Sequence, residues 1–247
     1  MNNRVVRYLS FILAFALGLS LTATAQSEED ESFENELSYG VNFNSNGGLI
    51  GGVFVRSVYP MNNRMYQFGG LEIVEIKHPK ENRLYSETGD QFIAGKQNYL
   101  FVIRPHYGRE FVLFRKAAES GVQVNAIAAA GPSLGLLAPY YIRYNYGGPG
   151  GEDIRTEQYD PQKHRSLENI MGNGTVFQGL SESNVNFGAH IKGGLSFEYG
   201  RYRESIAGIE VGFMLELFPK EMVIIPQAEN EQLFTSVYLN LYYGRRK

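Results

Sequence analysis

Four histidines are the side chains in this sequence best suited to catalysis or metal binding: His78, His106, His164 and His190. No two of them have the i, i+4 spacing that places two ligands on one helix face, and the chain has no cysteine to complete a zinc site. His190 could act as a base for a serine nucleophile, either Ser196 or a serine on a neighbouring strand. The sequence therefore predicts no metal and no cofactor, and keeps a hydrolase only as an alternative.

Other catalytic signatures are missing from the sequence, which has no G-x-S-x-G, no P-loop and no G-x-G-x-x-G. The polar segment 146–183 opens with two glycine pairs and carries several carboxylates, but lacks the ordered ladder of a calcium loop. We interpret it as a long loop that carries whatever recognition the protein performs, because loops on rigid scaffolds commonly do so. A solvated cap without a ligand is the alternative.

The stretch 184–199, NVNFGAHIKGGLSFEY, alternates apolar and polar residues without a break. Its odd positions are apolar and end in Phe197 and Tyr199, whereas its even positions include His190, Lys192 and Glu198. Alternate side chains of a strand point to opposite faces. A strand this long is unusual in a soluble protein and typical of one that crosses a bilayer at a tilt.

The same alternation recurs along the chain and predicts an all-β fold: a closed, up-and-down antiparallel transmembrane β-barrel. The count is eight strands, with ten as the alternative. Only a closed barrel lets strands pair every backbone group inside lipid. The fifth strand either runs unbroken over 122–145 or breaks near Gly131-Pro132. The expected strands cover residues 37–44, 49–59, 64–76, 97–107, 122–145, 184–199, 205–218 and 232–243.

Residues 1–25 are predicted to be a signal peptide, with Arg4 and Arg7 before an apolar run and the cleavage site Ala23-Thr24-Ala25. Residues 26–36 form an acidic linker. Residues 37–247 then form a single barrel domain with a long extracellular loop at about 146–183 and a basic tail at 244–247. We expect loops at 77–96 and 219–231 and either a short strand or a packed turn at FVLFRK within 108–121.

Polar residues that share the inward parity define a candidate site inside the barrel. We interpret them as a structural network of paired charges, because side chains fill an eight-stranded barrel and buried charges must pair. A ligand or catalytic site there is the alternative. The residues are Arg56, Glu72, Arg104, His106, His190, Lys192, Glu198, Glu210 and Glu216.

Four tyrosines of the opposite parity stand near the ends of the expected downward strands, where an aromatic girdle meets the membrane surface. They are Tyr59, Tyr107, Tyr199 and Tyr243. The connections after strands 2, 4 and 6 have roughly five, fourteen and five residues, whereas those after strands 3, 5 and 7 are all long. The shorter set is therefore expected in the periplasm and the longer set outside the cell.

Several segments resemble outer-membrane β-barrel proteins of Bacteroidetes-type Gram-negative bacteria: TATAQ, GVQVNAIAAAGPSLGLLAPYY, GLSFEYGRY and LFTSVYLNLYYGRRK. The resemblance covers most of the chain after the signal peptide. It rests on barrel features rather than catalytic motifs, so it implies fold and location only. The four residues after Tyr243 depart from the commonest barrel ending, a terminal aromatic.

These observations favour an integral outer-membrane barrel without a transport pore, with a structural, adhesive or assembly-related role. The alternatives are a barrel enzyme acting on lipid or lipopolysaccharide and a soluble periplasmic lipocalin-like binder, which would face its apolar side chains inward. Expected partners are outer-membrane lipid and, during biogenesis, periplasmic chaperones and the barrel-assembly machinery. No basic patch suggests nucleic acid, and the net charge is -3. The extracellular ligand is not identified by the sequence.

Overall fold

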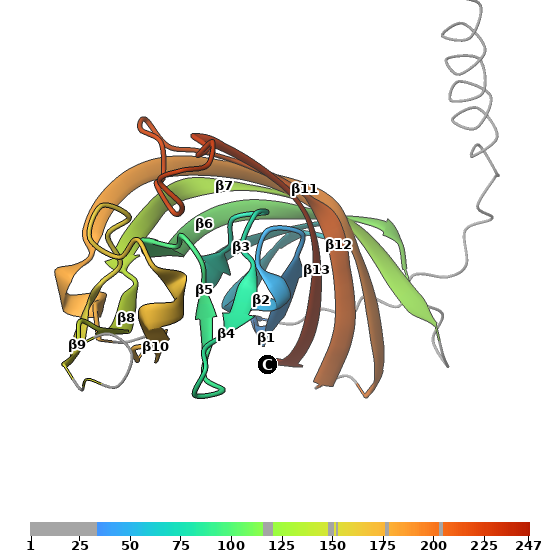
Figure 1. Cartoon of the computed structure of the whole chain (residues 1–247). Coiled ribbons are helices and arrows are strands. Elements are labelled where there is room, and N and C mark those ends of the chain that lie inside the picture. Colours follow the sequence, from blue (N-terminus) through green and yellow to red (C-terminus); the bar gives the residue numbers. More distant parts are fainter. Residues whose placement is uncertain (1–33, 116–120, 148–150, 152, 176–177, 203–204) are drawn as a thin grey trace, which may run out of the picture. The chain divides into compact units, whose positions relative to one another are not determined.

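A computed structural model describes residues 34–115, 121–147, 151, 153–175, 178–202 and 205–247. The predicted signal peptide and most of the acidic linker lie outside these residues. Eight strands close into an antiparallel barrel in the order β1-β13-β12-β11-β7-β6-β3-β2 (Figure 1), so the prediction of eight strands rather than ten is confirmed. The strands are β1 (Glu36–Asn44), β2 (Gly48–Asn62), β3 (Met65–Ile76), β6 (Asn98–Phe114), β7 (Val122–Pro139), β11 (Asn184–Tyr202), β12 (Ser205–Leu217) and β13 (Leu233–Arg246).

The barrel is apolar outside and polar inside. Outward side chains such as Val53, Ile191 and Leu241 are exposed, whereas inward ones such as Glu72 and Asn240 are buried. A lipocalin has the opposite polarity, with an apolar interior and a polar surface, so the soluble alternative is wrong. The exposed apolar wall suits lipid instead.

Helical structure is limited, in the part of the chain that the structure describes, to the short turns η1 (Leu167–Asn169) and η2 (Leu180–Glu182). No helix there has the length and apolar character needed to cross a membrane.

Two adjacent strands differ from their predicted limits. β6 was expected to end at Tyr107, but it continues to Phe114, and β7 passes through Gly131-Pro132 without a break and ends at Pro139. Gly131 lies so close to the carbonyl of Pro105 on β6 that there is no room for a Cβ atom. The Gly-Pro pair therefore marks a close approach of two strands rather than a strand end.

The apolar alternation beyond Pro139 belongs to a second sheet. β8 (Tyr141–Asn145) pairs with β9 (Ile154–Gln158) and with β10 (Ile170–Asn173) in the order β10-β8-β9. A hairpin of β4 (Arg83–Tyr85) and β5 (Gln91–Ile93) contacts β10 (Figure 1). We call these two pieces the cap. The segments expected to be loops at 77–96 and 146–183 thus contain ordered strands.

The cap packs around a hydrophobic core that it shares with Tyr99 of β6 and Ala138 of β7. Tyr140, Ile142 and Tyr144 are buried, and they cluster with Phe92 of β5 and Ile170 of β10. The same alternation that places side chains toward lipid in β7 places them in this core in β8, which explains why the sequence could not show where the barrel strand ends.

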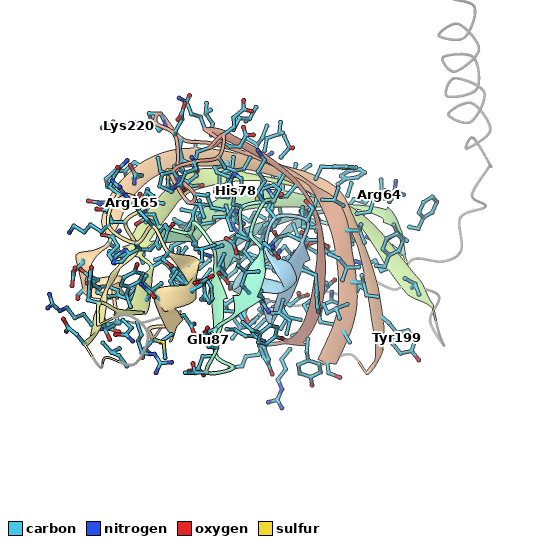
Figure 2. All side chains as sticks on the ribbon, in the orientation of Figure 1. Arg64, His78, Glu87, Arg165, Tyr199 and Lys220 are labelled. Atoms are coloured by element: carbon cyan, nitrogen blue, oxygen red, sulfur yellow. The ribbon has the colours of Figure 1, made fainter. Side chains whose placement is uncertain are left out.

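The connections between strands fall into two sets, one at each end of the barrel. One end, the hairpin end, carries the Asn63–Arg64 turn between β2 and β3 and the paired strand ends Glu36 and Arg246. The other, the loop end, carries the cap and the connection 218–232 between β12 and β13. In Figure 2, Arg64 marks the hairpin end and Arg165 lies among the long connections of the loop end.

Candidate functional site: a sealed lumen beneath a cap

The connection 218–232 folds back into the lumen at the loop end. Its apolar side chains pack against inward residues of β3 and β6, forming one buried cluster of Val74, Ile76, Leu100, Val102, Phe218, Met222, Ile224 and Ile225. The backbone amides of Gln97 and Asn98 donate hydrogen bonds to the carbonyl of Ile224, at 2.9 and 3.3 Å. We call this segment the plug. The sequence predicted only a loop here, although the run of apolar residues at 222–225 was the available signal.

Below the plug, a continuous chain of ion pairs crosses the lumen. Arg56 Nη1 on β2 lies 3.0 Å from Glu210 on β12, and Lys192 Nζ on β11 lies 3.7 Å from both Glu210 and Glu72. Arg104 on β6 then lies 3.6 Å from Glu72. Each of these side chains is at least nine-tenths buried. These ion pairs bring together residues that the sequence alternation predicted to share the interior face of the barrel.

Arg104 continues the chain to Glu216 on β12. Its Nε and Nη2 atoms donate to the two carboxylate oxygens at 2.8 and 2.7 Å. A bidentate guanidinium–carboxylate pair is among the stronger polar contacts in proteins because it combines charge with fixed geometry. Together with the plug, this network places packed side chains across the lumen.

A second group of charges closes the hairpin end. Arg246 Nε donates to Glu36 at 2.9 Å, and Arg246 Nη2 donates to Glu198 at 2.7 Å. Glu36 was expected in the linker and Arg246 in a basic tail, and both predictions are wrong because β1 begins at Glu36 and β13 runs to Arg246. Both residues have the inward parity of their strands, which was the signal for finding them.

Glu110 is a further interior charge that the sequence reasoning missed, because β6 was expected to end before it. It is buried and accepts a hydrogen bond from the side-chain amide of Asn125 on β7. Asn125 in turn accepts one from Gln123, at 3.0 Å. Extending the inward parity of β6 past Tyr107 would have identified Glu110.

The two interior histidines hold structural positions. His190 Nδ1 lies 3.0 Å from Ser133 Oγ, and Ser133 donates its proton to Glu216 at 2.5 Å. Since that hydroxyl has only one proton, His190 donates to Ser133 and does not act as its base. Ser196 instead bonds Tyr242 Oη at 2.9 Å. His106 Nδ1 is bonded to the carbonyl of Arg104 at 3.1 Å.

This geometry lacks the base–nucleophile contact that a hydrolase would need at these two serines. Within the described ranges, no group of three or more His, Asp or Glu side chains is placed to hold a metal ion.

The four tyrosines proposed for the girdle all lie on the outer face, with exposed fractions of 47, 56, 55 and 39% for Tyr59, Tyr107, Tyr199 and Tyr243. Tyr243 makes an edge contact with Tyr39 on β1, with ring centroids 6.1 Å apart. Tyr107 does not stand at a strand end, because β6 continues to Phe114.

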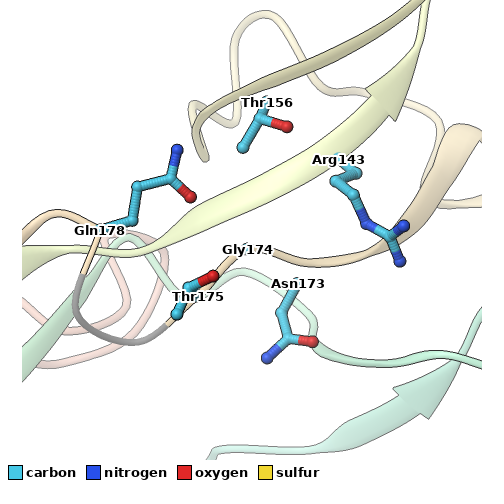
Figure 3. A pocket seen from close by; sticks show the side chains of 6 residues that line it. All are labelled: Arg143, Thr156, Asn173, Gly174, Thr175 and Gln178. Atoms are coloured by element: carbon cyan, nitrogen blue, oxygen red, sulfur yellow. The ribbon is translucent and has the colours of Figure 1, made fainter.

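The cap carries an open pocket of about 360 Å³ (Figure 3). Its wall combines hydroxyl, amide and guanidinium groups from β8, β9, the end of β10 and the segment that follows it: Arg143, Thr156, Asn173, Gly174, Thr175 and Gln178. Arg143 also forms an ion pair with Asp90 in the β4–β5 turn. Such a lining suits a polar ligand with several hydroxyl groups, or one with a modest negative charge.

A polar triad of Tyr146, Glu157 and His164 stabilises the part of the cap around β9. Tyr146 donates its hydroxyl proton to Glu157, and His164 Nε2 lies 3.3 Å from the same carboxylate. The backbone amide of Asp160 donates to His164 Nδ1 at 2.9 Å, which fixes the ring. The hydrogen bond from Tyr146 lowers the pKa of Glu157, and the same bond raises the pKa of Tyr146 to about 12.

A closed barrel with an apolar exterior and a charged, filled interior is an integral membrane protein of the outer-membrane type. No protein-family model and no curated protein matches the chain. Among solved structures, the chain is similar to Ail, the attachment invasion locus protein of Yersinia pestis, with 12% identity, a TM-score of 0.40 and coverage of 87% of this chain and 99% of that one.

Two further solved structures are similar over the same share of this chain, 87%. Neisserial surface protein A has 10% identity, a TM-score of 0.37 and 97% of its own chain covered. The outer membrane protein W of E. coli has 11% identity, a TM-score of 0.30 and 98% of its own chain covered.

Proposed function

We propose that this protein is a non-conducting outer-membrane anchor that presents its cap outside the cell for adhesion or recognition. The observation that carries the proposal is the contrast between the two ends of the structure. The lumen contains the plug and buried ion pairs, whereas the cap is an ordered sheet and hairpin that pack on the ends of β6 and β7 and carry an open polar pocket. A barrel that only sealed or braced the membrane would have no need of an ordered cap with a pocket.

The orientation of the barrel follows from its connections. Outer-membrane barrels have short periplasmic turns and long extracellular loops, so the loop end with the cap faces outward and the hairpin end faces the periplasm. Outer-membrane lipid around the wall, and the chaperones and assembly machinery that deliver such barrels, are the partners we propose. An origin in Bacteroidetes-type bacteria is the proposal from the sequence segments described above.

A lipid- or lipopolysaccharide-modifying enzyme remains the second function that the sequence suggested. The geometry disfavours the serines considered for it, because Ser133 is fully buried and bonded to Glu216, and Ser196 is bonded to Tyr242. A membrane enzyme would need its nucleophile within reach of lipid.

Pore activity is tested by reconstituting the full barrel in planar bilayers. We expect no ion conductance in the native protein. Steady channels in the native protein would contradict the anchor proposal.

Recognition is tested with cells that display the full protein on an array of neutral and anionic oligosaccharides. We expect binding that is lost in the double variant Asn173→Ala/Thr156→Ala, which strips polar groups from the pocket. The matched control is Glu87→Ala, an exposed residue in the β4–β5 turn. Binding that is absent, or equal in both variants, would leave the barrel a structural protein and refute recognition through this pocket.

A further inference from the structure

The outer wall of the barrel has a hollow of about 670 Å³. Its floor is made by small residues of β7 and β11, namely Ala128, Ala130 and Gly193. Its sides are larger residues, among them Ile191 and Phe213, whose exposed fractions are 57 and 71%. The hollow is therefore a groove between apolar ridges on the face that contacts lipid.

One cation stands at the edge of this groove. Arg109 on β6 is exposed on the outer wall, directly opposite Gln67 on β3 and Ala128 on β7. Its described polar contact is a weak one, 4.0 Å from the sulfur of Met65. No carboxylate lines the groove. A guanidinium on a lipid-facing wall is costly unless a phosphate or water receives it.

The register places the polar and apolar parts of this surface in one row. From Arg109 the row passes to Ala128, then to Gly193 on β11 and to Phe213 on β12. On the other side of Arg109, Tyr107 donates its hydroxyl to Gln67 at 2.9 Å. The surface is thus polar at the Arg109 end and an apolar groove at the other end. An amphiphilic molecule has the same arrangement of polar and apolar parts.

We propose that this groove binds one phospholipid from the surrounding membrane, with its phosphate at Arg109 and an acyl chain along Ala128 and Gly193. Arginine binds phosphate through charge-assisted hydrogen bonds, and a flexible chain can fill a narrow groove that a rigid wall cannot. A second copy of the barrel fits the groove less well, because a two-fold contact would bring no carboxylate to Arg109. This inference goes beyond the proposed function and depends only on membrane insertion.

The test uses the full protein in nanodiscs with phosphatidylglycerol that carries a photoreactive diazirine in its acyl chain. Diacylglycerol with the same chain is the second arm, since it lacks the phosphate. After irradiation, adducts are mapped by mass spectrometry. We expect adducts to concentrate at 128–130 and 191–193 relative to the wall at Val53 and Val55, and to fall in the diacylglycerol arm.

Two variants separate the headgroup from the chain. Arg109→Gln should reduce the groove adducts about tenfold, the effect of losing one charge-assisted hydrogen bond, while the exposed Arg245→Gln should not. Ala128→Phe should fill the groove and block the adducts, with the outward Ala207→Phe as its control. Retained heat-modifiable gel migration shows that each variant has folded.

Three results would overturn the proposal. Adducts spread evenly over the wall would mean ordinary annular lipid. Adducts unchanged by Arg109→Gln would show that Arg109 does not bind the lipid phosphate. Protein–protein crosslinks through the groove would assign it to a second barrel.

Discussion

Arg104 and Glu216 form a bidentate ion pair across the lumen, between strands that are not neighbours in the barrel. β11 and β7 separate β12 from β6 around the wall, so this contact ties two sides of the barrel together through its interior. Glu72 and Ser133 add further contacts to the two members of the pair. The pair therefore has both an electrostatic and a bracing role.

Removal of Arg104 should destabilise the barrel strongly. Arg104→Met leaves Glu72 and Glu216 facing each other without this cation in a buried site, and breaking a buried pair on one side costs about 3–5 kcal/mol. The free energy of unfolding, measured with urea in lipid vesicles, checks this. Arg245→Met, at an exposed outward position, should change it by less than about 0.5 kcal/mol. Similar urea midpoints for the two variants would show that the pair contributes little.

The membrane face can be tested on β12, where Met214 and Leu215 point to opposite sides. Leu215 is 45% exposed and Met214 is 4% exposed. Leu215→Arg should weaken folding into bilayers by about 2–4 kcal/mol if it lies near mid-depth, and by less in thin bilayers. Met214→Arg should cost about 1–3 kcal/mol through overpacking, with the same value in thick and thin bilayers. Refolding equilibria in the two lipids measure both.

The register brings the two penalties closer together, so the dependence on bilayer thickness is the property that separates the variants. Met214 lies directly opposite Lys192 on β11, so an arginine there would also meet a like charge. A penalty at Met214 that depends on bilayer thickness, with none at Leu215, would invert the face assignment. No dependence at either position would argue against a membrane-embedded wall.

The orientation can be tested with single cysteines, because the chain has none of its own. Arg165→Cys in the cap should react with an impermeant maleimide on intact cells, whereas Arg64→Cys at the hairpin end should react only after the outer membrane is permeabilised. Both residues are exposed, so accessibility within the fold does not bias the comparison. The reverse labelling pattern would show the opposite orientation, with the cap in the periplasm and the hairpin end outside the cell.

The cap should loosen in acid because of Glu157. The hydrogen bond from Tyr146 lowers the pKa of Glu157 in the folded cap, so the stabilisation is complete above the ordinary carboxyl pKa of about 4.3 and is lost as the pH falls through the lower folded value. The protection factors of the β9 amides, which are exchange rates corrected for the pH dependence of intrinsic exchange, should therefore fall at acid pH. Tyr146→Phe should abolish that fall, and Tyr85→Phe, in the β4–β5 hairpin, should not. Equal acid sensitivity in both variants would exclude this triad as the cause.

Period-two alternation was enough to predict the closed eight-stranded barrel, because the membrane and the lumen impose opposite polarities on every strand. Strand limits were harder. Residues 111–114 of β6, FVLF, are apolar on both faces, since inward Val112 is buried while outward Phe111 and Leu113 are exposed. A strand that is apolar on both sides shows no alternation, so the sequence allows either a short strand or a packed turn at FVLFRK.

The candidate sites were predictable to different degrees. Interior charges could be assigned by parity, but their partners could not, since contacts such as Arg104 with Glu216 depend on the curvature that brings distant strands together. The plug and the parts of the cap at 77–96 and 146–183 have the sequence character of loops, because polar and glycine-rich residues surround their short apolar runs. Only the tertiary contacts of Phe218 and Tyr140 distinguish these packed segments from solvated ones.

The contact of Arg246 with Glu36 has a consequence for the closure of the barrel. Glu36 lies at the start of the first barrel strand and Arg246 near the end of the last, so this ion pair joins the two ends of the barrel sequence across the seam between β1 and β13. The same arginine also contacts Glu198 on β11, so the seam is tied to a strand that is not part of it.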